Sequence, residues 1–257
     1  MKQSLFPDSW VGTTPIHFPF AVNVVAYIII WAVCLSGLYL IWKRPKQLGF
    51  LQRWSTQDVL MVAIMAVMLE VYDNMIGDQF ITPIVQLIPF GHAFALNDIP
   101  YMFLLMVGVA IIRKPGAATA MVFLNFLLMQ LLYGGSEASA LFWPYGILQG
   151  LFVDLYIVFR KGRIFQSGSN PFKDGLIMGA LRAVPAVIIQ NVFLVPFLIG
   201  TATTFGYVFL MSLFNLIGNG FEAAILSALA IRVANSVNPS SGVDPKIKLT
   251  EKKGSAL

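Results

Sequence analysis

The sequence has little charge and almost no cysteine or histidine. Only 11% of its 257 residues are charged and 58% are apolar, whereas soluble domains average about 25% charged residues. A soluble protein of this length needs more charge on its surface, so the composition excludes soluble enzymes, disordered chains and nucleic-acid-binding domains. One cysteine and two histidines exclude an internal disulfide and argue against a metal centre built from these residues.

The sequence contains several long apolar segments. A helix needs about 20 mostly apolar residues to cross the hydrocarbon layer of a membrane. Seven segments approach or exceed this length, at 18–42, 57–77, 96–112, 115–133, 141–159, 174–199 and 205–231. The sequence therefore predicts an all-α protein, a polytopic membrane helical bundle.

The chain is expected to have three parts. Residues 1–53 form an N-terminal segment with an additional transmembrane helix, 18–42, and a basic cytoplasmic loop. Residues 54–232 form a membrane domain of six helices, and residues 233–257 form a polar cytoplasmic tail. The apolar segment 81–95 contains two prolines and a glycine, which predicts an interfacial or re-entrant segment, with an ordinary loop as the alternative.

The basic residues predict the orientation in the membrane. All but two of the 17 lysines and arginines lie in the connections after the first, third and fifth spans or beyond the seventh. The exceptions are Lys2 and Arg182. Because lysine and arginine concentrate on the cytoplasmic side, we expect a multi-pass protein of the cell membrane with its N-terminus outside and its C-terminus in the cytoplasm.

Polar residues within apolar spans are the candidate functional residues, because they are costly in a membrane. Asn215, Asn219 and Glu222 share one helical face, which either bonds to neighbouring helices or lines a polar cavity. An outward-opening cavity of carboxylates, amides and aromatic rings suits a cationic aromatic molecule. The predicted substrate-binding residues are Glu70, Tyr101, Trp143, Gln149, Asn215, Asn219 and Glu222.

Two charged residues lie at matched depth in neighbouring spans. Asp154 lies six residues before Arg160, and Arg182 lies eight residues after Asp174. At about 1.5 Å per residue, both lie roughly 9–12 Å inside the inner boundary. We therefore expect a structural ion pair between Asp154 and Arg182.

Two stretches resemble a known family. The first is RKPGAATAMVFLNFLLMQLLYGG at 113–135, and the second is GILQGLFVDLYIVFRKGR at 146–163. Together they contain a basic-KPGA turn, a glycine-ended helix and a later QG-x-x-x-Asp run. This pattern resembles the S components of energy-coupling-factor (ECF) transporters, specifically the YkoE-like branch. The resemblance covers roughly residues 54–231 and implies a six-helix S-component core, to which the first span is an addition.

The resemblance implies a vitamin-binding membrane subunit with no catalytic residues, metal or cofactor. Such a subunit captures thiamine or its hydroxymethylpyrimidine precursor and works with a coupling transmembrane subunit and two cytoplasmic ATPases. Small residues allow close helix contact in lipid, so Ala63 and Ala66 are the expected docking positions for the partner. The row Gly175, Gly179 and Ala183 is the alternative.

Two other classes of function remain open from the sequence. One is a self-sufficient secondary transporter of a small cationic aromatic solute, and the other is a membrane enzyme or assembly factor. The sequence has no GxxxxGK[ST] phosphate-binding loop, so the chain itself does not supply ATP energy. It also lacks HExxH and GxSxG, which argues against a hydrolase.

Overall fold

The computed structural model describes residues 6–47, 54–134, 139–166 and 168–237. Within these ranges the chain is helical and contains no strand, and one isolated β-bridge pairs Pro15 with Thr204. The predicted basic loop lies partly, and the predicted tail mostly, outside the described residues.

Seven longer helices make up most of the structure. They are α2 (Phe20–Gln47), α3 (Thr56–Glu70), α5 (Ile99–Ile112), α6 (Ala117–Tyr133), α7 (Trp143–Phe159), α8 (Pro171–Val184) and α10 (Phe205–Val237). The short helices are α1 (Asp8–Val11), α4 (Thr82–Val85), α9 (Val195–Leu198) and the 3₁₀ turns η2 (Leu96–Asp98) and η3 (Ala140–Phe142). Two π-helical segments, η1 (Val71–Ile81) and η4 (Pro185–Leu194), continue α3 and α8.

Five helical stretches in the described residues are long and apolar enough to cross a membrane. They are Phe20–Ile41, Thr56–Val85, Ala140–Phe159, Pro171–Leu198 and Phe205–Val237. Two shorter apolar helices, Leu96–Ile112 and Ala117–Leu132, lie between them in the chain. These elements confirm the prediction of an all-α, polytopic membrane bundle, while the count of seven spans, the orientation and the division at residues 54 and 232 stay predictions.

Local sequence signals explain where several helices begin. Ser55 and Asp58 form a capping box at the start of α3, in which each side chain binds the other residue's backbone N–H. The side chain of Asn170 accepts a hydrogen bond from the N–H of Lys173 at the start of α8. Proline occupies the first turn of α5, α7 and α8, where its missing N–H costs nothing.

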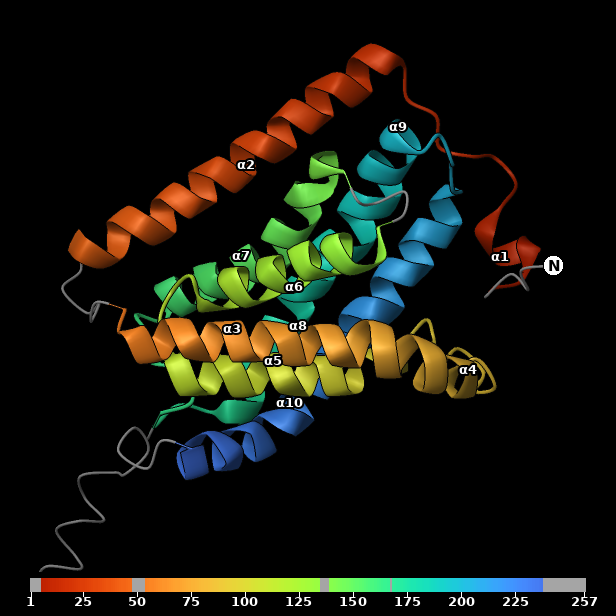
Figure 1. Cartoon of the computed structure of the whole chain (residues 1–257). Coiled ribbons are helices and arrows are strands. Elements are labelled where there is room, and N and C mark those ends of the chain that lie inside the picture. Colours follow the sequence, from red (N-terminus) through yellow and green to blue (C-terminus); the bar gives the residue numbers. More distant parts are fainter. Residues whose placement is uncertain (1–5, 48–53, 135–138, 167, 238–257) are drawn as a thin grey trace, which may run out of the picture.

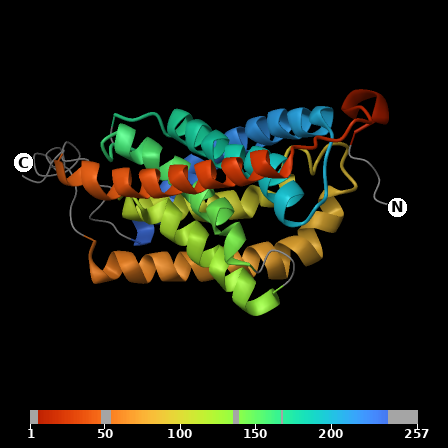
Figure 2. The ribbon, with the colours of Figure 1, turned by 90° about the horizontal axis from the view of Figure 1, so that it is seen from above.

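The helices pack around one main core, with α2 along one side of the bundle (Figures 1 and 2). The core is made by buried side chains of α3, α5, α6, α7, α8 and α10. A second apolar cluster joins α2 to α7 through residues that include Cys34 and Leu151. Many apolar residues elsewhere on α2 are exposed, such as Ile28 and Tyr39, as expected for a surface that faces lipid.

The backbones of α8 and α10 approach each other closely. A Cβ atom added at Gly175 would lie 2.5 Å from the carbonyl oxygen of Ala223, and one added at Gly179 would lie 2.1 Å from that of Asn219. Only glycine permits this approach of the two backbones. The small-residue row proposed as an alternative partner-docking surface is therefore used inside the bundle.

The segment between η1 and α5 folds back on the bundle. It contains α4 and a series of turns, and Ala93 and Ala95 are buried within it. The carbonyl oxygen of Phe94 lies so close to Gly218 of α10 that a Cβ atom there would be only 1.9 Å away. This contact fixes η2 and the start of α5 against α10.

Candidate functional site

Buried polar side chains from three helices form a chain of contacts in the core. Glu70 on α3 accepts a hydrogen bond through Oε2 from Nδ2 of Asn125 on α6, at 2.8 Å. The Tyr101 hydroxyl on α5 donates to Oδ1 of Asn125 at 3.4 Å. All three residues are buried, so each polar group needs these partners to replace water.

Arg182 on α8 connects this series of contacts to η2 and to α10. Its Nη1 donates to Oδ2 of Asp98, at 2.7 Å, and to Oδ1 of Asn219 on α10, also at 2.7 Å. Its guanidinium carbon lies 4.5 Å from the centroid of the Tyr101 ring, a cation–π distance. A charge, an amide and a ring face therefore stabilise the buried arginine together.

The polar face of α10 completes the site. Nδ2 of Asn219 donates to Oδ1 of Asn215 at 2.8 Å. Glu222 lies almost one turn further along, retains only 8% of its exposure, and interacts electrostatically with Asp98 and Arg182. We call the whole set the polar cluster, which consists of Glu70, Asp98, Tyr101, Asn125, Arg182, Asn215, Asn219 and Glu222.

Two members of the polar cluster have buried atoms with no hydrogen-bond partner among the described residues. They are both carboxylate oxygens of Glu222 and the Nε of Arg182. Buried polar atoms are normally bonded, so these atoms are the part of the cluster with capacity to bind a further polar group. The cluster also contains three carboxylates and one guanidinium, and a fourth carboxylate, that of Asp73 on η1, interacts electrostatically with Arg182 and Asp98.

The structure brings together most of the predicted substrate-binding residues. Glu70, Tyr101, Asn215 and Asn219 share the network, and Glu222 lies beside it. Their role in binding a substrate stays a prediction.

Trp143 and Gln149 lie apart from this network. The indole Nε1 of Trp143 donates to Oε1 of Gln130 at 3.1 Å, and its ring packs edge-on against Phe123. Gln149 is buried on α7, and no hydrogen bond joins it to the polar cluster in the part of the chain that the structure describes. A structural role for Trp143 in holding α6 and α7 together accounts for its contacts.

The predicted ion pair between Asp154 and Arg182 is wrong. Asp154 instead accepts hydrogen bonds from the N–H groups of Ala118 and Thr119, at 3.2 and 2.7 Å, and from the Thr119 hydroxyl at 2.5 Å. It thus satisfies free N–H groups in the first turn of α6, where a helix favours negative charge. Matched depth along two helices does not make their side chains face each other.

The two predicted docking residues have different environments. Ala63 is exposed on α3, whereas Ala66 is fully buried at 0% exposure. Ala66 is therefore part of the core and is not accessible to a partner, because positions three apart on a helix do not always share an exposed face. Ala63 remains a predicted docking position.

Sequence reasoning missed two members of the polar cluster. Asn125 is an amide within an apolar helix, which is itself a signal of a functional or bonding role. Asp98 ends the short η2 turn directly before α5, and no helical spacing in the sequence links it to Arg182. Because segment 86–95 folds back on α10, this loop residue lies next to Arg182.

The described residues contain no group of three or more His, Cys, Asp or Glu side chains arranged to hold a metal ion. The cluster's carboxylates are instead spread over α3, η2 and α10. The carboxylates are therefore separate hydrogen-bond acceptors in the polar interior of the bundle.

One comparison with known proteins gives a match. Residues 57–168 match the family model described as the permease component of an ABC-type cobalt transport system. The matched range runs from α3 to the end of α7 and the following turn, which is less than half of the chain. Searches among curated proteins and among solved structures gave no match.

The match corrects two expectations from the sequence. It describes a permease component and cobalt, so the assignment to S components of the YkoE-like branch, with thiamine or hydroxymethylpyrimidine as ligand, is wrong. It also describes a subunit of an ABC-type system, which does not support a self-sufficient secondary transporter. Over α3 to α7 this chain is similar to the permease components of ABC-type cobalt transport systems.

Proposed function

We propose that this chain is a membrane permease component of an ABC-type transport complex that moves a small cation, with Co²⁺ as the substrate to test first. The family match over residues 57–168 supports the transport class and the metal. The carboxylate excess of the polar cluster supports a cationic substrate. The structural observation that carries the proposal is Glu222, whose two buried carboxylate oxygens have no hydrogen-bond partner in the described residues.

The chemistry of the cluster suits transient binding of a cation. A hard or borderline cation prefers carboxylate and amide oxygens, and Glu222, Asn215 and Glu70 supply these from two helices. Arg182 keeps one carboxylate, Asp98, engaged at 2.7 Å. Because no three-ligand metal group exists among the described residues, the site favours passage of the ion over tight retention.

Energy for transport must come from partner subunits. The sequence contains no GxxxxGK[ST] motif, so ATP hydrolysis requires a separate ATPase, as the term ABC-type implies for the matched family. A cation moves against its gradient only when the two states of the complex bind it with different affinity, and ATP supplies that difference. We therefore propose an ATPase and a further transport subunit as partners, and no enzymatic activity in this chain.

Uptake of radioactive Co²⁺ by cells that express the chain with its natural partner subunits tests the proposal. We expect accumulation above that of cells without the chain, and its loss when cellular ATP is depleted. The variant Glu222→Gln should lower the initial rate at least about tenfold, since it removes from a buried site the carboxylate proposed to bind the cation. Equal accumulation in cells with and without the chain would contradict the proposal.

A further inference from the structure

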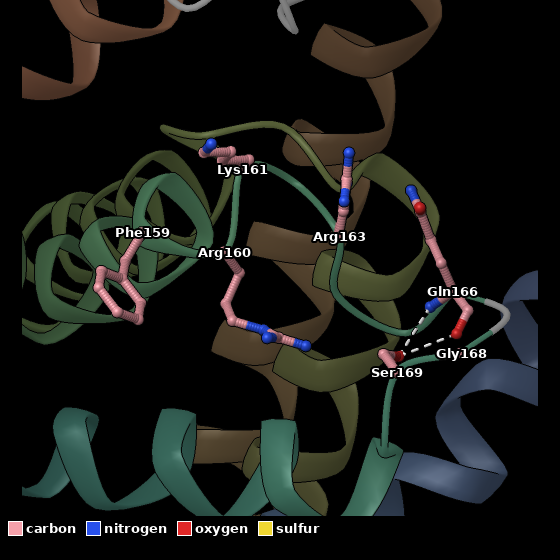
Figure 3. Close-up of a pocket in the computed structure, with 7 residues that line it drawn as sticks. All are labelled: Phe159, Arg160, Lys161, Arg163, Gln166, Gly168 and Ser169. Atoms are coloured by element: carbon pink, nitrogen blue, oxygen red, sulfur yellow. Dashed lines mark hydrogen bonds between the residues drawn. The ribbon is translucent and has the colours of Figure 1, made fainter.

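A basic cavity lies at the connection between α7 and α8, at the end of the bundle that also holds the α5–α6 turn (Figures 1 and 3). Its volume is about 480 Å³, within the usual range of small-ligand sites, roughly 300–1,000 Å³. The lining residues are Phe159, Arg160, Lys161, Arg163, Gln166, Gly168 and Ser169. This cavity belongs to neither the polar cluster nor any transport step described above.

The cavity has a strong excess of positive charge. Three of its lining residues are cations, and one of them, Arg160, pairs with Asp174 at 3.5 Å. That carboxylate is buried and already accepts hydrogen bonds from the Tyr156 hydroxyl, at 2.8 Å, and from the N–H of Phe165, at 3.3 Å. It therefore neutralises one cation of the three.

Lys161 and Arg163 have no acidic partner in the part of the chain that the structure describes. Figure 3 shows both side chains projecting from the turn that follows α7, on the side of the cavity away from α8. Both are exposed, so their charges can meet an incoming anion. Two unpaired cations beside one cavity favour a phosphate group, which accepts several charge-assisted hydrogen bonds.

The turn holds Lys161 where glycine is the usual residue. The N–H of Gly162 donates to the carbonyl oxygen of Ile157, at 2.9 Å, and that of Lys161 to Val158, at 3.0 Å. This is the bond pattern of a Schellman helix end, whose left-handed position favours glycine. Lys161 occupies it with φ 54°, at a cost of about 1–2 kcal/mol relative to glycine.

Apolar rings beside the cations indicate where the phosphate comes from. Phe159 lines the cavity and is 80% exposed, and Phe172 at the start of α8 is 45% exposed. Exposed rings at the end of an apolar span suit contact with acyl chains, whereas a free phosphate ion gains nothing from them. Basic pockets at the ends of membrane helices are known to accept lipid headgroups.

We propose that the α7–α8 cavity binds the phosphate of an anionic phospholipid headgroup through Lys161 and Arg163. Arg160 forms the inner wall and stays paired with Asp174. Ser169 closes the opposite wall, where its hydroxyl donates to the carbonyl oxygen of Gln166 at 2.9 Å and accepts from the Gln166 N–H at 3.0 Å.

The test measures lipid retention on the purified full chain. Native mass spectrometry of the protein in neutral detergent, supplied with equal phosphatidylglycerol and phosphatidylcholine, should show preferential retention of phosphatidylglycerol. Each of the variants Lys161→Gly and Arg163→Gln should lower that preference about fivefold. The matched control is Lys173→Gln, an exposed lysine on α8 outside the cavity lining, and it should retain the preference.

Lys161→Gly also separates binding from folding. Glycine suits the left-handed turn, so the melting temperature of this variant without added lipid should equal or exceed that of the wild type. Equal retention of the two lipids by the wild type would overturn the proposal.

Two further outcomes would assign the cavity to another ligand and overturn the lipid proposal. Inorganic phosphate should not displace phosphatidylglycerol at equal concentration, and complete displacement would identify free phosphate as the ligand. An acidic protein subunit that co-purifies with the wild type but not with Lys161→Gly, without any lipid preference, would identify a protein partner.

Discussion

Arg182 and Asp98 form an ion pair of 2.7 Å between α8 and the short η2 turn. The two residues are 84 positions apart in the chain. The arginine side chain is 9% exposed and the aspartate side chain 23%. The pair therefore joins the segment that precedes α5 to the α8–α10 pair, next to the unpartnered carboxylate of Glu222.

Removing either partner of this pair should destabilise the protein. Arg182→Ala and Asp98→Ala each leave a partly buried charge without its partner, and we expect a loss of about 3 kcal/mol, the low end for buried pairs because Asp98 keeps some exposure. The double variant should lose less than the sum of the two single losses. Thermal melting of the four proteins measures this coupling, and additive losses would show that the two residues do not interact.

Asp154 should stabilise the start of α6 independently of Arg182. Asp154→Ala leaves the N–H groups of Ala118 and Thr119 without an acceptor, which should cost at least about 2 kcal/mol. Asp154→Asn keeps an acceptor oxygen and should cost less. Melting temperatures of these variants, alone and combined with Arg182→Ala, should be additive, and strong coupling between Asp154 and Arg182 would contradict the observed contacts.

Gly179 should be intolerant of a larger residue. Gly179→Ala places a methyl group 2.1 Å from the carbonyl oxygen of Asn219, which forces α8 and α10 apart and should cost about 1–3 kcal/mol. Gly220→Ala is the matched control, because its methyl group meets its nearest atom, the carbonyl oxygen of Leu176, at 3.3 Å. We expect a clear drop in melting temperature for the first variant and a small change for the second. Equal effects would refute the close-packing argument.

The two alanines of α3 should respond differently to enlargement. Ala66→Trp forces a large ring into the packed core and should prevent folding. Ala63→Trp adds a ring to an exposed surface, so the isolated chain should fold and elute normally in size-exclusion chromatography. If Ala63 is a docking position, co-purification of the partner subunits should fall in this second variant, and unchanged co-purification would remove Ala63 from the interface.

Helical periodicity allowed part of the site to be predicted from the sequence. Asn215, Asn219 and Glu222 share a face because a helix repeats every 3.6 residues. A polar face is costly in contact with lipid, so it was expected to face the interior of the bundle. The partner of Arg182 was not predictable in this way. Depth along a helix says nothing about the direction of a side chain around the axis, and Asp98 reaches Arg182 only because the preceding turns fold back on Gly218.

The resemblance to S components is wrong, because the matched family is described as a permease component of a cobalt transport system. The stretches at 113–135 and 146–163 fall inside the range that matches the permease family. Within them, Asp154 on α7 accepts a hydrogen bond from Thr119 at the start of the preceding helix, α6. Asp154 thus joins two helices of the bundle, and Glu222, on which the proposed cation binding rests, lies outside the matched range.

The initial rate of ATP-dependent Co²⁺ uptake in Glu222→Gln, compared with Asp8→Asn, tests the central claim most directly. Both variants replace a carboxyl group with an amide, but Glu222 is buried in the polar cluster and Asp8 is exposed on α1. If the cluster admits the cation, uptake should fall at least about tenfold in Glu222→Gln and stay at the wild-type rate in Asp8→Asn, with both proteins present in the membrane at equal amounts. A wild-type rate in Glu222→Gln would contradict the account.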